Sequence, residues 1–194
     1  MAKQKDISHS ILIISSTEQF EMQVKKHLVG FLTIDVRKSC AAARRAILEQ
    51  NYDIIVMRLP LPDDLGLDLA LDAVEDSTAS VLVEVPREIY EDVTDRLSDY
   101  GIMVMPSPSQ MFQLDKALRY MKARQNVVHN LKQKLQKAQE KTEEVRIVSK
   151  AKLMLMEEKH MTEDDAHRFI GKTAMNNGIS RRKAAEMIME DLDS

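Results

Sequence analysis

The chain has 194 residues, of which 44% are hydrophobic and 30% charged, and its net charge is −3. This composition predicts a soluble protein with one large or two smaller domains. It has no apolar run of the ~18 residues that a membrane-spanning helix needs, and its first residues lack a signal-peptide pattern. We therefore expect a cytoplasmic protein without membrane association. Cys40 is the single cysteine, which excludes an intrachain disulfide or a thiolate metal cluster.

The net charge hides a gradient along the chain. Residues 119–152 contain ten basic and three acidic side chains, whereas residues 1–118 and 153–194 are acidic on balance. This basic stretch fits either the solvated flank of a coiled coil or a surface that attracts a polyanion such as nucleic acid. Charge alone does not decide between the two interpretations.

Apolar runs typical of buried strands alternate with helical patterns through the N-terminal half. The strands are expected at residues 11–15, 32–36, 53–57, 80–85 and 102–105, and the helices at residues 16–27, 39–49, 67–74 and 89–100. Ser107 and Pro108 then offer a cap and a first-turn proline for a further helix. Five β-α units in about 110 residues predict a flavodoxin-like, doubly wound parallel sheet of five strands with helices on both faces.

This pattern, over roughly residues 9 to 120, resembles the receiver domain of bacterial response regulators, the signalling module of two-component systems. The resemblance also rests on the third strand and its loop, with Pro60 and Asp64-Leu65-Gly66, and on Met105-Pro106 near the fifth strand. Receivers accept phosphate on an Asp at the end of the third strand. An acidic pair after the first strand holds magnesium, a Ser or Thr follows the fourth strand, and a Lys precedes the Pro after the fifth.

None of these positions carries the residue that the family uses. They are occupied by Ser15 and Ser16 at the acidic pair, Arg58 at the phosphoacceptor, Glu84 or Val85 at the hydroxyl, and Met105 at the lysine. A guanidinium cannot accept a phosphoryl group, and two serines lack the anionic oxygens that magnesium prefers. We therefore predict a pseudo-receiver without metal or cofactor, controlled by a protein partner, a ligand or oligomerisation. One hypothesis is that Arg58 pairs with a nearby carboxylate and so mimics a fixed signalling state.

From about Leu114 to Met156 the sequence contains no Pro or Gly, which favours one long helix. At ~1.5 Å per residue it would be roughly 60 Å long, more than a small core can cover. Its apolar residues follow the three-and-four spacing of a coiled coil, which predicts a dimer seam at Met121, Val128, Leu131, Leu135, Ala138 and Val145. We therefore expect a homodimer through a parallel coiled coil. The alternative is a single helix that folds back on its own domain.

Two shorter helical patterns follow a break near His160. Thr162 and the acidic residues after it cap the first pattern, and Gly178 is placed to end it. Phe169 lies on the apolar stripe of this helix and is assigned to the core. His160 and His167 have no third ligand nearby, so no zinc site is expected.

The segment from about Glu143 to Leu192 is similar to the ANTAR domain, the RNA-binding output module of some transcription antiterminators. The similarity rests on short motifs in a consistent order: Ala151-Lys152, Leu155-Met156, Thr162-Glu163-Asp164-Asp165-Ala166, Lys172-Thr173-Ala174-Met175, and Ala184-Ala185 with Ile188. In architecture the whole chain resembles the amidase-operon antiterminators, which also look like receivers without a phosphorylation site. The resemblance implies a protein that binds paired hairpins in a nascent leader transcript and so prevents terminator formation.

Basic and amide side chains of this segment are the candidate RNA contacts, because cations neutralise phosphates and Asn can read base edges in a loop. They are Lys150, Lys152, Arg168, Lys172, Asn176, Asn177, Arg181, Arg182 and Lys183. The predicted organisation is a receiver-like domain at 1–118, a coiled-coil linker helix at 119–145 and a three-helix RNA-binding domain at 146–194. The sequence shows no catalytic constellation, so an enzyme is not expected.

Two other functions fit the same sequence. A short helical bundle after a receiver can be a DNA-binding helix-turn-helix, although the acidic balance after Leu153 argues mildly against it. A protein-interaction adapter would use the coiled coil and the pseudo-receiver and would have no affinity for nucleic acid. An active phosphoreceiver is the weakest alternative.

Overall fold

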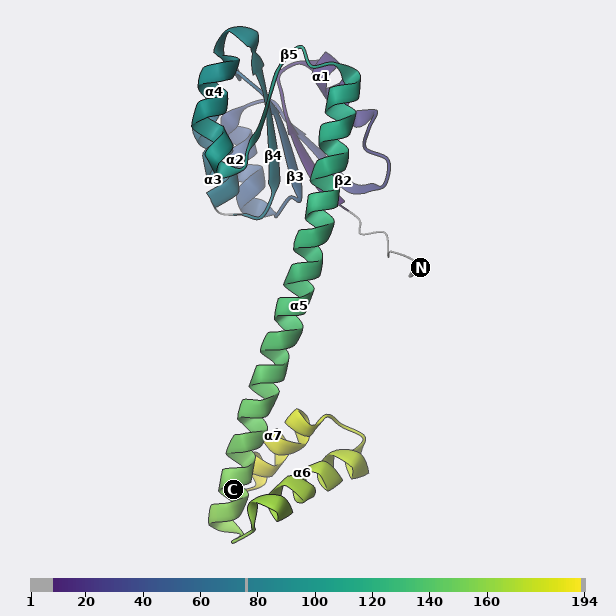
Figure 1. The fold of residues 1–194 in the computed structure, drawn as a ribbon, viewed down its shortest axis with the longest axis vertical. Helices are drawn as coiled ribbons and strands as arrows, with labels where there is room; N and C mark the ends of the chain where they lie inside the picture. The colour runs from purple at the N-terminus through teal and green to yellow at the C-terminus, as the bar shows by residue number, and fades with distance from the viewer. Residues whose placement is uncertain (1–8, 76, 193–194) are drawn as a thin grey trace. The chain divides into compact units, whose positions relative to one another are not determined.

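The computed structural model describes residues 9–75 and 77–192. The chain divides into two compact units, Met1–His129 and Asn130–Ser194. One continuous helix, α5 (Met111–Glu158), contributes its first part to one unit and its last part to the other (Figure 1). Residues 1–8, on which the signal-peptide prediction rests, lie outside the described residues. No helix in the described part of the chain is both long and apolar enough to cross a membrane.

The first unit contains a five-stranded parallel sheet with the strand order β2-β1-β3-β4-β5. The strands are β1 (His9–Ile14), β2 (Phe31–Arg37), β3 (Ile54–Arg58), β4 (Ser80–Pro86) and β5 (Met103–Ser107). The order reverses between β1 and β3, and in doubly wound sheets ligands bind beyond the carboxyl ends of the strands at this point. The predicted fold class is confirmed.

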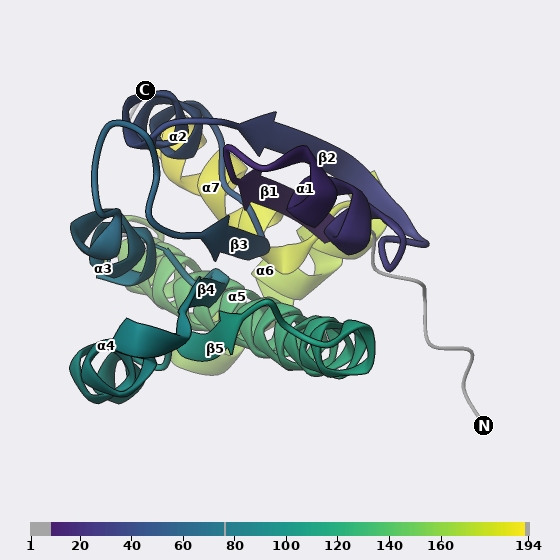
Figure 2. The same cartoon turned by 90° about the horizontal axis from the view of Figure 1, so that it is seen from above.

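Helices cover both faces of this sheet (Figure 2). They are α1 (Glu18–Lys25), α2 (Cys40–Glu49), α3 (Leu67–Glu75), α4 (Tyr90–Leu97) and the start of α5, with short 3-10 turns at Arg87–Ile89 and Ser98–Tyr100. One core packs the sheet against α2, α3 and α4, and a second packs it against α1 and α5. Side chains alternate along β1, so that Leu12 and Ile14 enter the first core while Ile11 and Ile13 enter the second. This explains why the strand is apolar throughout.

The first part of α5 belongs to the core of the first unit. Leu114, Ala117, Leu118 and Met121 are buried against the sheet. The helix begins at Met111, so the prediction that Pro108 occupies its first turn is wrong. Between β5 and α5 lies Ser109, whose hydroxyl donates a hydrogen bond to the buried carboxylate of Glu84 on β4.

The second unit is a three-helix bundle of the last part of α5, α6 (Glu163–Asn177) and α7 (Arg181–Leu192). Its core comprises Ile147, Ala151, Leu155, Ala166, Ile170, Ala174, Ala184, Ala185 and Ile188. Thr162 caps α6 through a bond to its side chain from the backbone nitrogen of Asp165, and Gly178 ends the helix in the left-handed conformation with φ 62°. Phe169 is 42% exposed, so its assignment to the core is wrong.

Candidate functional site

A buried ion pair occupies the carboxyl ends of the central strands. Arg58, the last residue of β3, places Nη1 3.6 Å from Oε1 of Glu84 on β4. The Glu84 side chain is 1% exposed and the Arg58 side chain 27%. Arg58 therefore does pair with a nearby carboxylate. Desolvation makes such a pair costly to break, since removal of one partner leaves a buried charge without its counter-charge.

Three further side chains contact this ion pair. Arg58 Nη2 donates a hydrogen bond of 3.0 Å to Oγ of Ser107, and the Ser109 hydroxyl donates to Oε2 of Glu84. The Arg58 guanidinium also lies 5.7 Å from the centre of the Phe20 ring, within reach of a cation-π contact. The guanidinium at the predicted phosphoacceptor position thus contacts Glu84, Ser107 and Phe20.

The structure corrects one position of this site. β5 ends at Ser107, and the proline that follows the strand is Pro108. The position before that proline is therefore Ser107, whereas Met105 lies inside β5 opposite Glu84 and is 8% exposed. The sequence has two prolines here, Pro106 and Pro108, and only the end of β5 at Ser107 distinguishes them.

Ser15 and Ser16 stand where receivers carry the acidic pair. Ser15 is fully buried, and its hydroxyl accepts a 3.0 Å hydrogen bond from the backbone nitrogen of Thr17, while Ser16 is exposed. Asp63 in the neighbouring loop accepts bonds from the backbone nitrogens of Cys40 (2.9 Å) and Ala41 (3.1 Å), which lower the pKa of its carboxyl. In the part of the chain that the structure describes, no three His, Cys, Asp or Glu side chains lie close enough together to hold a metal ion.

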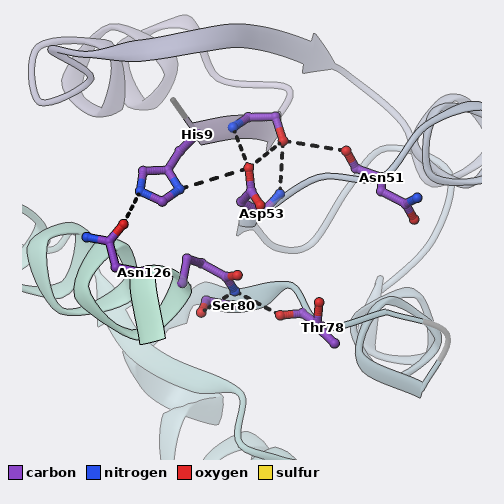
Figure 3. Close-up of polar contacts among 8 residues, drawn as sticks. His9, Asn51, Asp53, Thr78, Ser80 and Asn126 are labelled. Atoms are coloured by element: carbon purple, nitrogen blue, oxygen red, sulfur yellow. Dashed lines mark hydrogen bonds and ion pairs between the residues drawn. The ribbon is translucent and has the colours of Figure 1, made fainter. Parts of the chain in front are cut away.

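A second polar cluster lies at the amino-terminal edge of the sheet, where α5 passes the strands (Figure 3). His9 Nε2 lies 3.1 Å from Oδ1 of Asn126, and His9 Nδ1 lies 4.0 Å from Oδ2 of Asp53. Gln125 Nε2 donates to the Thr78 carbonyl at 2.8 Å and to the Ser80 hydroxyl at 3.0 Å.

His9 is 1% exposed, and burial, the largest cause, lowers its pKa. Asp53 and Asn126 oppose this shift, whereas Lys122 and His129 add to it. Because its partner Asn126 is on α5, this cluster ties the helix to the sheet through side chains that sequence analysis did not single out. The apolar spacing of α5 gave no signal for them.

The nine candidate RNA contacts all lie on the second unit. They are exposed except Lys152, whose side chain is 20% exposed. Three of the cations already have an acidic partner within the unit: Lys152 with Glu163 at 2.5 Å, Arg168 with Asp165 at 2.8 Å, and Arg182 with Glu186 at 2.8 Å. The hydrogen bond to Glu186 is the main cause that raises the pKa of Arg182.

The other cations are differently placed. Within residues 9–75 and 77–192, Lys150, Lys172, Arg181 and Lys183 form no ion pair. Arg181 and Lys183 are in the first turn of α7, next to the turn that follows Asn177. These exposed cations can neutralise phosphates without first losing an internal partner.

The two asparagines at the end of α6 differ in a similar way. Asn177 Nδ2 donates a 2.9 Å bond to the carbonyl of Thr173, four residues earlier in the same helix. Asn176 is exposed, and its side chain makes no hydrogen bond among the described residues. Asn176 is therefore the better placed of the two to pair with a base edge.

The middle of α5 is exposed on every side. All residues from 129 to 142 are exposed, including Leu131 at 58% and Leu135 at 59%. Val145, further along the predicted seam, is 58% exposed. Apolar side chains at regular helical spacing and with this exposure mark a surface that another helix can cover.

The N-terminal end of the predicted seam is partly wrong. Met121 is 2% exposed and packs in the core of the first unit, and Val128 is only half exposed. Their neighbours Tyr120 and Val127 are 64% and 57% exposed and are also seven residues apart. The exposed stripe therefore continues through Tyr120 and Val127, which lie about 100° around the helix from Met121 and Val128.

Comparisons with known proteins agree with the division into two units. The sequence model of the ANTAR domain matches residues 136–189. The transcriptional regulatory protein PdtaR of Mycobacterium tuberculosis is 26% identical over 141 residues, which cover 72% of this chain and 68% of that protein.

Solved structures resemble the N-terminal part. A signal receiver domain of an HD domain-containing protein from Pseudomonas fluorescens has a TM-score of 0.55 at 15% identity, covering 62% of this chain and 99% of that one. A structure of adenylate cyclase from Rhodopirellula baltica has a TM-score of 0.60 at 15% identity, covering 68% of this chain and 99% of that one. At such low identity the likeness shows the fold alone.

Proposed function

We propose that this chain, which has the receiver-like domain and the ANTAR domain of an ANTAR response regulator, binds RNA hairpins in nascent leader transcripts as a dimer and prevents transcription termination. The observation that carries the proposal is the set of exposed, unpaired cations on α5, α6 and α7 within the ANTAR match. The proposed surface consists of Lys150, Lys172, Asn176, Arg181 and Lys183, with Lys152, Arg168, Asn177, Arg182 as paired neighbours.

Dimerisation is the second part of the proposal. Leu131, Leu135, Ala138 and Val145 form the proposed seam, and exposure of the first two above one half supports a partner helix. A second copy of the chain offers the same apolar stripe, so a parallel pair of helices would bury both. A dimer carries two ANTAR domains, which matches two hairpins, and binding of the first hairpin raises the effective concentration of the second.

The third part is control without aspartyl phosphorylation. Arg58 is the residue at the phosphoacceptor position of the resemblance, and it is paired with Glu84. That position therefore has no carboxylate to phosphorylate. Input would then come from a regulatory protein partner, a ligand or the change between monomer and dimer.

The test is binding of the purified full-length protein to a leader RNA with two hairpins, measured across a salt series. A single hairpin and a DNA duplex serve as competitors. We expect preference for paired hairpins and an affinity that falls with salt with a slope of about −0.7 to −0.9 per phosphate contact. The variant Leu135→Asp should lose the preference for paired over single hairpins, because a charge in the seam opposes dimerisation.

The control for charge is a matched pair of variants. Lys172→Ala with Arg181→Ala and Lys183→Ala removes three cations from the proposed surface. Lys25→Ala with Lys26→Ala and Arg45→Ala removes three exposed cations from the first unit. Equal loss of affinity in both would show only a general charge effect. Preference for the DNA duplex would support a DNA-binding regulator, and absence of nucleic-acid binding would support the adapter.

A further inference from the structure

A pocket in the second unit is lined by two residues of α6, Phe169 and Thr173, that are close in the helix to Lys172 and Asn176 of the proposed RNA surface. It has a volume of about 390 Å³ and is lined by residues of α5, α6 and α7. Its apolar walls include Leu155 and Ile188, which are 1% and 6% exposed, and Phe169, which is 42% exposed. A partly exposed aromatic ring that lines an apolar pocket can offer a flat face to a ligand.

The rim of the pocket is polar. Lys159 and Asp191 line it, and in the described chain neither side chain forms an ion pair or a hydrogen bond. Thr173 also lines it; its hydroxyl donates a 3.0 Å bond to the Phe169 carbonyl, which leaves its oxygen able to accept. The pocket thus combines an aromatic face, one cation and hydrogen-bond acceptors in a small volume.

These groups favour one class of occupant. A purely apolar segment of a protein would desolvate Lys159 and Asp191 without giving them partners, which costs several kcal/mol per charge. A nucleobase has a planar face for Phe169 and carries both donors and acceptors on its edge. The carboxylate of Asp191 accepts hydrogen bonds from the exocyclic amino groups of adenine, cytosine or guanine, and uracil has none.

The neighbouring residues can hold the backbone of the same nucleotide. Lys172 is three residues after Phe169 on α6, and residues at this spacing have Cβ atoms about 5–6 Å apart on the helix surface. Asn176 is four residues after Lys172 on the same flank. A base in the pocket therefore brings its phosphates toward Lys172 and Asn176, which belong to the proposed RNA surface.

We propose that this pocket binds one unpaired nucleobase of an RNA hairpin loop, stacked on Phe169 and selected by Asp191 for an exocyclic amino group. The inference rests on the proposed RNA-binding function and adds to it a site that reads the loop. It also gives Phe169 a role that explains why an aromatic side chain is exposed beside a core built mainly of Ala, Ile and Leu.

The experiment uses the full-length protein and a synthetic RNA of two hairpins with randomised loops, from which binding loops are selected. We expect Phe169→Ala to weaken binding of the selected RNA by about 5- to 150-fold, the range found when an aromatic that stacks on a base is truncated. Phe169→Tyr should retain most of the affinity because it keeps the ring. Met175→Ala, an exposed apolar residue of the same helix at 76% exposure, is the matched control and should change little.

A spectroscopic readout separates stacking from a general loss of structure. The chain has four Phe, so fluorophenylalanine labelling gives few ¹⁹F resonances, which single substitutions assign. The selected RNA should shift the Phe169 resonance and leave that of Phe20, which is fully buried in the first unit, unchanged. Replacing loop bases one at a time by uracil should reduce affinity at one position, and by less in Asp191→Ala, which lacks the acceptor, than in the wild type.

The outcomes distinguish the two proposals. If the wild type selects no RNA, both the proposed function and this pocket are wrong. If the wild type binds RNA while Phe169→Ala binds equally well and the Phe169 resonance does not move, the pocket is wrong and the proposed function stands.

Discussion

The buried ion pair of Arg58 and the surface around Lys183 use similar charged groups in opposite ways. Arg58 is turned inward onto a carboxylate that is 1% exposed, and Ser107 and Ser109 hydrogen-bond to the two charged side chains. Lys183 is exposed and forms no ion pair in the described chain. A charge that is neutralised inside the protein stabilises one conformation, whereas a charge without an internal partner is available to a ligand.

The largest effect, on the free energy of unfolding, is expected from breaking the buried ion pair of Arg58 and Glu84. Arg58→Met should lower the free energy of unfolding by roughly 3–5 kcal/mol, because it leaves Glu84 buried without a counter-charge. Chemical denaturation measures this change. The double variant Arg58→Met with Glu84→Gln should recover most of the loss, since no buried charge remains. A stable single variant would show that Arg58 contributes little to the folded state.

A smaller effect should separate paired from unpaired cations on the proposed RNA surface. Lys183→Ala should weaken RNA binding by about 1 kcal/mol and reduce the salt slope by about one. Arg182→Ala should cost less, because its guanidinium must leave Glu186, 2.8 Å away, before it can contact phosphate. The double variant should bind RNA weakly while its unfolding transition stays unchanged. Equal effects of the two single variants would remove the distinction between paired and unpaired cations.

The smallest effect should come from His9, which is buried at the opposite edge of the sheet from Arg58. Its pKa is lowered in the folded protein, mainly by burial, so the unfolded chain binds a proton more readily. The free energy of unfolding should therefore fall as the pH drops through about 6.5, the ordinary pKa of histidine. His9→Gln should reduce this dependence in denaturation curves from pH 8 to 5. A wild type whose stability rises over this range would contradict the assignment.

The elements of this fold could be predicted because their apolar spacing is regular. The five strands and the order of the helices follow from runs such as residues 53–57 and from the turn residues between them. The absence of an aspartate at position 58 was equally visible, because a missing residue type needs no geometry to be recognised.

The remaining errors have a common physical origin. Ser107 and Met105 both precede a proline, and Tyr120 and Met121 are adjacent on one helix. In each case an offset of one or two residues along the sequence decides which side chain occupies the predicted position. When two apolar stripes overlap, the spacing of apolar residues does not determine which of two neighbouring residues faces the core. Phe169 was misplaced for the same reason, since a residue at the border of a stripe can face either the core or the solvent. The network of His9 gave no periodic signal at all.

Cys40 provides a built-in reporter of local opening. This single thiol is 5% exposed, and burial, helped by Asp63 and Asp64, raises its pKa to about 11. At neutral pH it is therefore protonated and shielded, and alkylating reagents need α2 to leave the sheet before they can reach it. The rate of Cys40 modification thus measures how often the start of α2 detaches under native conditions. Cysteines introduced at exposed positions can be labelled selectively beside it.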